Sequence, residues 1–236
     1  SFITAVPAQM QMGDSWYQGT ADAVYQNLNR LREFRPDVVA VFGADHVYKM
    51  NVRQVVDAHA AAGARATVAC LRVPRLEARS FGVAQVDASG RIRDFVEKPG
   101  DPPAVPDDPD TAFASMGNYI FDTATLVDAL EADAARPDSS HDFGRDIIPR
   151  LVASGERVYT YLFWDENKKE SKYWRDVGTI DAYFDASMDL IQVDPVFNLY
   201  DPSWPLRTYQ PQLPPAKFVF NEEGRRGVAT ESIVSN

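Results

Sequence analysis

Residues 37–51 read DVVAVFGADHVYKMN, an apolar run that changes abruptly into a group of polar side chains. The run DVVAVF is short, β-branched and apolar on both faces, as expected of a central strand in a parallel sheet. Asn51 then offers a helix N-cap, and Gly63 is a natural stop for the helix that follows. A strand followed by a helix in this way indicates an α/β fold, in which ligands bind beyond the carboxyl ends of the strands.

The elements on either side of this stretch extend the same pattern. Residues 19–34 carry apolar side chains at helical spacing, and Thr20 is suited to cap that helix. Residues 66–73, ATVACLRV, form the next strand after the helix at 51–63. Helix, strand, helix and strand in this order predict a mostly parallel sheet flanked by helices.

The middle of the chain predicts antiparallel pairing in the same sheet. GVAQVD at 82–87 and RIRDFVEK at 91–98 flank a turn, which is typical of a hairpin, so the sheet should be mixed. Residues 99–110 hold five prolines and four aspartates and predict a loop. The remaining expected elements are a strand at 114–122, a helix at 124–134, a broken helix at 142–155, a strand at 157–164, a charged loop at 165–172 and a helix at 181–192.

Composition narrows the class of protein. With 236 residues, 45% of them hydrophobic, the chain is long enough to build a sizeable core in one large or two small domains. A formal net charge of −10 argues against generic binding to nucleic acid or to an anionic membrane. No apolar run is long enough to span a membrane, and no signal peptide is visible. The single cysteine, Cys70, predicts a buried thiol without a partner, which suits the cytoplasm.

Two aspartates are candidate metal ligands. Asp45 comes just after the apolar strand, and Mg²⁺ takes one or two protein carboxylates and fills its shell with water and phosphate oxygens. Taken alone, Asp45 is equally well explained as a turn or helix-capping residue. Asp176 in YWRDVG offers a second carboxylate, because it follows a strand-like segment and precedes a helix start. The pair predicts a magnesium site.

Other polar residues lie at the ends of predicted elements. Glu97 and Lys98 end the strand at FVEKP; the lysine is suited to a phosphate and the carboxylate to sugar hydroxyls, although an exposed ion pair is the simpler interpretation. Asp142 and Phe143 open a helix, where the aspartate could be only an N-cap. We interpret His141 as a solvated or capping histidine. The sequence contains no zinc-ligand spacing and no evident Ser-His-Asp arrangement.

Nine segments, in order along nearly the whole chain, together resemble the ADP-glucose pyrophosphorylase family, the glucose-1-phosphate adenylyltransferases of bacterial glycogen synthesis. They are WYQGTADAV, FGADHVYKM, FGVAQVD, FVEKPGDPP, ASMGNYIFD, SSHDFGRDIIP, YWRDVGTIDAY, WPLRTY and PPAKFV. The resemblance implies a Rossmann-like, glycosyltransferase-A-like nucleotidyltransferase domain at 1–194. Residues 195–236 would be a linker to a left-handed β-helix domain outside this sequence. The family's Gly-rich loop, GGxGxRLxPLT, is not found here, so we expect a partial catalytic domain with weak or absent activity.

The resemblance also implies a reaction and its residues. ATP and glucose 1-phosphate would give ADP-glucose and diphosphate with Mg²⁺, in an allosteric cytoplasmic homotetramer. Asp45, Lys98 and Asp176 would be catalytic, with the two aspartates holding the metal. The residues implied to bind substrates are Tyr17, Gly19, Gly82, Glu97, Lys98, Ser115, Tyr119, Asp142, Phe143 and Trp174.

Two alternatives remain open at this stage. The chain could come from a pyrophosphorylase that uses UTP or dTTP, or from a regulatory subunit that binds sugar phosphates without turnover. Retention of Asp45, Lys98 and Asp176 favours catalysis, because a non-catalytic subunit need not keep metal and phosphate ligands. His46 and Lys49 are expected to have structural or neighbouring roles.

Overall fold

The structure is a computed structural model that describes residues 3–7, 16–165, 170–207, 212–220 and 222–234. It divides into two compact units. Unit 1 comprises Ser1–Gly43 with Asn51–Lys172, and unit 2 comprises Ala44–Met50 with Tyr173–Asn236. The predicted charged loop at 165–172 lies partly outside the described residues. The predicted division between a catalytic domain at 1–194 and a linker at 195–236 stays a prediction.

Unit 1 is built on a six-stranded sheet with the order β5-β4-β6-β3-β7, and β1 also pairs with β6. The 12-residue strand β6 pairs with β3 along one edge, and with β4 and then β1 along the other. The strands are β1 (Val38–Phe42), β3 (Ala66–Pro74), β4 (Gly82–Val86), β5 (Ile92–Glu97), β6 (Thr111–Asp122) and β7 (Val158–Leu162). A short ribbon of β8 (Trp164–Asp165) and β9 (Glu170–Ser171) follows.

The sheet is mixed, as predicted, but its parallel part is smaller than expected. Among the described strands β3 and β7 pair in parallel, while the other pairings of this sheet are antiparallel. The prediction that residues 37–42 form a central parallel strand is wrong, because β1 pairs with β6 antiparallel and its residues are half-buried or exposed. An apolar run indicates which faces of a strand are covered by other parts of the protein. It does not indicate whether the strand pairs in parallel or antiparallel, because that depends on the path of the chain between the strands.

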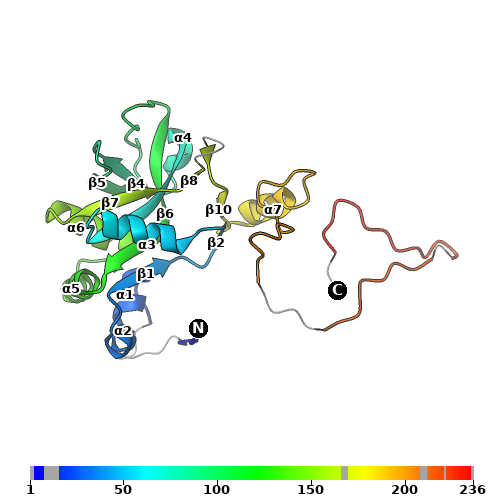
Figure 1. Cartoon of the computed structure of the whole chain (residues 1–236), viewed down its shortest axis with the longest axis horizontal. Helices are drawn as coiled ribbons and strands as arrows, with labels where there is room; N and C mark the ends of the chain where they lie inside the picture. Colours follow the sequence, from blue (N-terminus) through cyan, green and yellow to red (C-terminus); the bar gives the residue numbers. More distant parts are fainter. Residues whose placement is uncertain (1–2, 8–15, 166–169, 208–211, 221, 235–236) are drawn as a thin grey trace. The chain divides into compact units, whose positions relative to one another are not determined.

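Helices cover both faces of this sheet (Figure 1). The alternation of β3 separates the faces: Ala66, Val68 and Cys70 belong to the main core, while the Thr67 hydroxyl lies 2.8 Å from Nδ1 of His59 in α3 (Val52–Ala61). The main core is closed by α1, α2, α5, η1 and α6. These helices are α1 (Thr20–Tyr25), α2 (Leu28–Phe34), α5 (Thr123–Ala134), the π-helical η1 (Phe143–Ile147) and α6 (Ile148–Ala153), and the short α4 (Arg75–Ala78) follows β3.

Several local predictions are confirmed. Asn51 caps α3 by accepting a hydrogen bond from the Arg53 amide at 3.1 Å, and Gly63 follows the helix with a φ of +56°. The hairpin of β4 and β5 is present, and its turn is held by the Asp87 carboxylate, which accepts from the Ser89 amide. Residues 99–110 contain no helix or strand apart from an isolated bridge between Val105 and Asp108.

Two predicted helical segments are divided in the structure, the second of them as expected. The helix expected at 19–34 breaks after Tyr25 into α1 and α2. The N-cap of α1 is Gly19, and the hydroxyl of Thr20 instead donates to Asp142. The broken helix predicted at 142–155 is confirmed, because it begins as η1 and continues as α6, with a proline in the first turn of α6. Proline has no amide hydrogen, so it fits the first turn of a new helix better than a helix interior.

Unit 2 has fewer regular elements. An antiparallel ribbon of β2 (His46–Tyr48) and β10 (Trp174–Asp176) precedes α7 (Ile180–Asp189), which Thr179 caps by accepting from the Ala182 amide. The sequence did not predict β2 as a strand. Beyond Pro195 the described residues contain no helix or strand, as predicted. No helix in the described part of the chain has both the length and the apolar character needed to cross a membrane.

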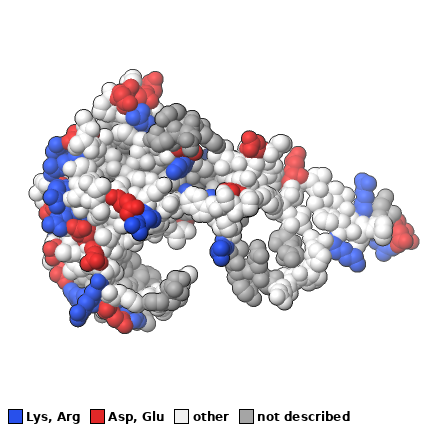
Figure 2. All heavy atoms as spheres, viewed as in Figure 1, with Lys and Arg blue, Asp and Glu red and all other residues white. Residues whose placement is uncertain are grey.

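The surface of unit 1 carries charges of both signs (Figure 2). Many are paired, for example Arg53 with Asp57 at 2.7 Å and Arg32 with Glu131 at 2.5 Å. On the face shown, basic side chains are interspersed with acidic ones. The sequence as a whole has more acidic than basic residues. A continuous basic surface of the kind that binds nucleic acid is therefore not visible on this face.

Candidate functional site

The first candidate site lies in unit 1, around the carboxylate of Glu97 at the end of β5. Gly82 of β4 is its direct partner across the hairpin. A Cβ atom on Gly82 would lie 2.7 Å from Glu97 Oε2, and one on Gly144 would lie 2.5 Å from the same oxygen. Only glycine leaves room for the carboxylate at these two positions. The structure thus gives Gly82 a specific task, the accommodation of Glu97.

A bulge in β6 brings Ser115 and Tyr119 to the same site. The register of β3 with β6 shifts between Val68 and Cys70, which pair with Tyr119 and Ser115 respectively. Gly117, with a φ of +68°, lies inside the bulge, and its amide donates to the Ser115 hydroxyl oxygen at 3.2 Å. Tyr119 stacks on Phe143 with ring centroids 5.6 Å apart. Four of the residues expected to bind substrates therefore gather in unit 1 from three segments, namely Ser115 and Tyr119 of β6, Phe143 of η1 and Glu97 of β5.

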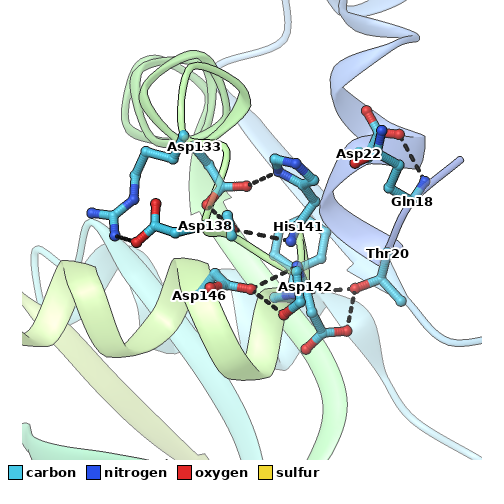
Figure 3. Close-up of polar contacts among 12 residues, drawn as sticks. Gln18, Thr20, Asp22, Asp133, Asp138, His141, Asp142 and Asp146 are labelled. Atoms are coloured by element: carbon cyan, nitrogen blue, oxygen red, sulfur yellow. Dashed lines mark hydrogen bonds and ion pairs between the residues drawn. The ribbon is translucent and has the colours of Figure 1, made fainter.

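Asp142 completes this group and also caps η1 (Figure 3). Its Oδ1 accepts from the amides of Gly144 at 2.9 Å and Arg145 at 3.0 Å. Its Oδ2 accepts from the hydroxyl of Thr20 at 2.9 Å. The capping role considered from the sequence is therefore present. It does not use the whole carboxylate, because a carboxylate offers about four acceptor positions and three are occupied here by described residues.

Burial and nearby charges change the pKa of two groups at this site, Glu97 and Tyr119. Burial raises the pKa of Glu97, and the charge of Asp142 raises it further, against smaller opposing effects of Lys98 and Arg145. Burial also raises the pKa of the Tyr119 hydroxyl, and both carboxylates add to the effect. Tyr119 is therefore a neutral donor at physiological pH. Acceptor carboxylates beside neutral hydroxyls and an aromatic ring are the groups that bind a sugar.

Lys98 adds a cation in an unusual backbone conformation. Its φ is +50°, in the left-handed region, and its amide donates to the carbonyl of Phe81 at 3.0 Å. A non-glycine residue in this region is uncommon and is often held there by a functional constraint. Among the predicted residues, Gly19 also lies in a confined place, because a Cβ there would be 2.3 Å from the carbonyl oxygen of His141. Tyr17 is placed elsewhere, with its hydroxyl 3.0 Å from the amide nitrogen of Asn27.

The second candidate site lies in unit 2, where the β2/β10 ribbon joins the two predicted metal ligands. Asp176 pairs with His46 across the ribbon, and the amide of Val177 donates to the carbonyl of Asp45 at 3.1 Å. One side-chain donor atom from each of Asp45, His46 and Asp176 lies within 4.8 Å of the others. Asp176 is far in sequence from the adjacent Asp45 and His46, so the pairing of β2 with β10 is what creates the cluster.

The chemistry of this cluster fits a divalent cation. Two oxygens bound to one Mg²⁺ at about 2.1 Å are at most about 4.2 Å apart, so a small rotation of exposed side chains is enough to bring these ligands together. The Asp45 side chain is 68% exposed, which leaves space for that rotation. Asp176 is oriented by the Gly178 amide, which donates to its Oδ1 at 2.8 Å. Trp174, expected at the substrate, packs edge-on against the His46 ring at 5.1 Å.

The sequence did not indicate that the polar side chains of His46 and Asn118 are candidates for ligand contact. Nδ1 of His46 and both amide atoms of Asn118 are buried and have no hydrogen-bond partner within the described residues. Such groups are costly to bury and are commonly satisfied by a ligand, an ion or water. No pattern in the sequence marks Asn118, since it lies within an otherwise apolar strand. Lys49 has the structural role expected of it, because its ammonium donates to the carbonyls of Trp204 at 2.8 Å and Asn198 at 3.3 Å.

The raised pKa of Glu97 leads to a prediction about stability. The folded protein holds the Glu97 proton more tightly than the unfolded chain does, so stability falls as the pH rises from the ordinary glutamate pKa through the raised value, and it stays lower above it. Glu97→Gln removes the titrating group and keeps its shape. We expect this variant to have a higher Tm than the wild type at about pH 7.5, and a smaller difference at about pH 4.

Glu77→Gln in α4 is the matched control, because Glu77 is exposed. Thermal denaturation of both variants at the two pH values measures the effect. An equal Tm change for the two substitutions, or a Glu97→Gln gain that does not depend on pH, would show that the burial of Glu97 and its proximity to Asp142 have no energetic consequence.

Comparison with known proteins shows the family of the chain. A family model described as nucleotidyl transferase matches residues 3–193. Similar proteins named glucose-1-phosphate adenylyltransferase occur in Rhodopirellula baltica (52% identical, 99% of this chain and 53% of that protein), Parafrankia sp. (53%, 100% and 59%) and Mycobacterium bovis (54%, 99% and 57%). The chain thus spans a little more than half the length of these relatives. With a sheet flanked by helices and a match over most of its length, the chain belongs to the nucleotidyl transferase family.

Proposed function

We propose that this chain carries the substrate and metal sites of a glucose-1-phosphate adenylyltransferase, which converts ATP and glucose 1-phosphate into ADP-glucose and diphosphate for glycogen synthesis. The observation that carries the proposal is the pairing of β2 with β10, which joins Asp45 and Asp176 in one cluster. The names of the similar proteins support the choice of substrates. The activity belongs to the whole polypeptide, of which these residues would form the catalytic part.

In this proposal Asp45 and Asp176 would hold Mg²⁺. The ion would supply charge neutralisation for the phosphates of the nucleotide. Since Mg²⁺ prefers oxygen ligands to imidazole, His46 would adjoin the ion and limit the movement of Asp45, whose carboxylate lies 3.5 Å from its Nε2.

The residues of unit 1 would bind glucose 1-phosphate. Lys98 would hold the phosphate as a compact cation, and Glu97 and Asp142 would accept hydrogen bonds from sugar hydroxyls. Ser115 and Tyr119 would complete the polar wall, with Phe143 supporting the tyrosine ring. A phosphate oxygen of the sugar phosphate then attacks the α-phosphorus of ATP, a new P–O bond forms, and the bond to the β-phosphate oxygen breaks to release diphosphate. Because the attacking oxygen is already ionised, positioning and charge neutralisation suffice and no general base is needed.

Two further proposals concern the setting of the enzyme. We propose that it works in the cytoplasm and as a homo-oligomer, a tetramer by resemblance to its family. Ile180, Tyr183 and Phe184 follow helical spacing along α7 and are 88%, 65% and 58% exposed, which is typical of a surface that is covered in an assembly. Sedimentation velocity of the whole gene product tests this, and a monomer at micromolar concentration would contradict it.

Metal binding is the first test of the site. We expect Mn²⁺, observed by electron paramagnetic resonance as a probe for Mg²⁺, to bind the chain, and Asp45→Asn or Asp176→Asn to weaken its affinity by about tenfold or more. Asp185→Asn in α7 is the control, because this aspartate is exposed and lies in the same unit. Loss of affinity that is equal in all three variants would argue against a defined site at Asp45 and Asp176.

Turnover tests the reaction itself. In the whole gene product we expect diphosphate release from ATP and glucose 1-phosphate that is faster than with UTP or dTTP. Lys98→Gln removes the ammonium and should raise KM for glucose 1-phosphate by about tenfold or more, with a smaller effect on KM for ATP. A preference for UTP or dTTP would support the alternative pyrophosphorylase. Sugar-phosphate binding with no turnover, unchanged by Asp45→Asn, would support a regulatory subunit.

A further inference from the structure

A buried carboxylate lies behind the sugar-binding group, at the end of α5. Asp133 is 2% exposed. Its Oδ1 accepts from Ser139 Oγ at 2.7 Å and from Arg150 Nη1 at 2.6 Å. Its Oδ2 lies 2.8 Å from Nδ1 of His141 (Figure 3). A buried charge is tolerated only when several donors satisfy it, and Asp133 has them. These contacts join α5 and α6 to the loop that leads into η1.

The loop residue that Asp133 holds most directly is His141. Its side chain donates to Asp133 Oδ2, and its amide donates at 3.0 Å to the Ser139 oxygen that itself donates to Asp133. The backbone of His141 has a φ of +54°, an uncommon conformation that a histidine adopts only when its surroundings require it. The side-chain contact with Asp133 and the amide contact with Ser139 therefore fix the direction in which the chain leaves His141.

The next residue is Asp142, and its orientation depends on that direction. Two amides at the start of η1 occupy its Oδ1, and the Thr20 hydroxyl donates to its Oδ2. The described residues therefore leave one acceptor position of about four, on Oδ2. The carbonyl of His141 also accepts from the Ala21 amide at 2.8 Å, so the same residue holds the start of α1, which carries Thr20, against Asp142.

We propose that the Asp133–His141 pair is a positioning device that aims the free acceptor position of Asp142 at a single hydroxyl of the sugar. This inference rests on the proposed function, in which Asp142 binds the sugar of glucose 1-phosphate. In this proposal neither Asp133 nor His141 touches the substrate. To cap η1, Asp142 needs only the two hydrogen bonds that its Oδ1 accepts. The orientation of its Oδ2 is set by the hydrogen bond from Thr20 and, through the backbone, by the contacts of His141.

Substitutions at His141 separate the side-chain contact from the backbone conformation. His141→Asn keeps a donor where Nδ1 stands, since both nitrogens are bonded to Cγ, and asparagine tolerates a positive φ. His141→Gly accepts the same φ without strain but lacks the donor. We expect His141→Gly to weaken binding of glucose 1-phosphate, measured by calorimetry, by about tenfold, and His141→Asn to stay within about twofold of the wild type.

Monodeoxy derivatives of glucose 1-phosphate identify the hydroxyl. One derivative should bind the wild type about tenfold more weakly than the parent compound and should lose no further affinity with His141→Gly. Hydrogen exchange provides a readout that does not require a ligand: the amides of Ala21, Gly144 and Arg145 should exchange faster in His141→Gly than in His141→Asn. Asp138→Asn is the control, because this exposed residue of the same loop pairs only with Arg136 among the described residues, at 2.7 Å.

The possible failures are distinguishable. If the wild type binds glucose 1-phosphate and His141→Gly binds it equally well, the positioning role is wrong and the proposed function is unaffected. If His141→Gly weakens every deoxy derivative by the same factor, His141 has a general structural role and the inference is overturned. If the wild type does not bind glucose 1-phosphate at all, the proposed function fails, and the inference that rests on it fails as well.

Discussion

The pairing of β6 with its neighbours is the constraint on which unit 1 depends. This strand of 12 residues runs between β3 on one edge and β4 and β1 on the other, and Met116, Ile120 and Phe121 on it are almost completely buried. A strand with neighbours along both edges has a fixed register, because a slip of one residue would turn its buried side chains to the wrong face. The bulge at Gly117 is the one local departure from that register, and it is what places Ser115 beside Tyr119.

Around this strand the site is assembled from residues that are distant in sequence. The hairpin of β4 and β5 supplies Glu97, and η1 supplies Asp142 and Phe143. Two glycines leave the space that the Glu97 carboxylate occupies. Bringing two carboxylates together in a partly buried place raises the free energy of the ionised pair, which is the kind of cost that proteins retain at binding sites. The buried Asp133 behind them keeps the supporting loop in one conformation.

Unit 2 follows a different principle, since a ribbon of only two short strands determines its cluster. The register that pairs Asp176 with His46 also brings Asp45 within reach. The same antiparallel pairing would not form between two isolated three-residue strands, because so short a ribbon is marginal in water. Contacts such as that of Tyr173 with Phe197, whose ring centroids are 5.3 Å apart, supply the packing that supports it.

The sequence alone predicted most of the elements, the mixed sheet and the resemblance to the nucleotidyl transferase family, and these are confirmed. It predicted them well because apolar periodicity, Asn51, Gly63 and the turn at Asp87 act over a few residues. Its errors concern longer range. The direction of β1, the break between α1 and α2 and the real partner of Thr20 all depend on segments that meet only after folding.

The roles of individual residues likewise depend partly on the local sequence and partly on contacts that form only in the folded protein. Residue type and position made Asp45, Glu97, Lys98, Asp142 and Asp176 candidates, because carboxylates and a lysine at the ends of elements suit a phosphate, sugar and metal site, and the family resemblance then implied their roles. Only the tertiary structure decided which contacts these side chains make. One carboxylate oxygen of Asp142 accepts hydrogen bonds at the start of η1, and His46 lies in one cluster with Asp45 and Asp176. The tertiary structure also decided the role of Asp133, which has no local signature. A side chain's hydrogen-bond partners and burial are set by what the fold brings to it, and that information is not contained in any short stretch of sequence.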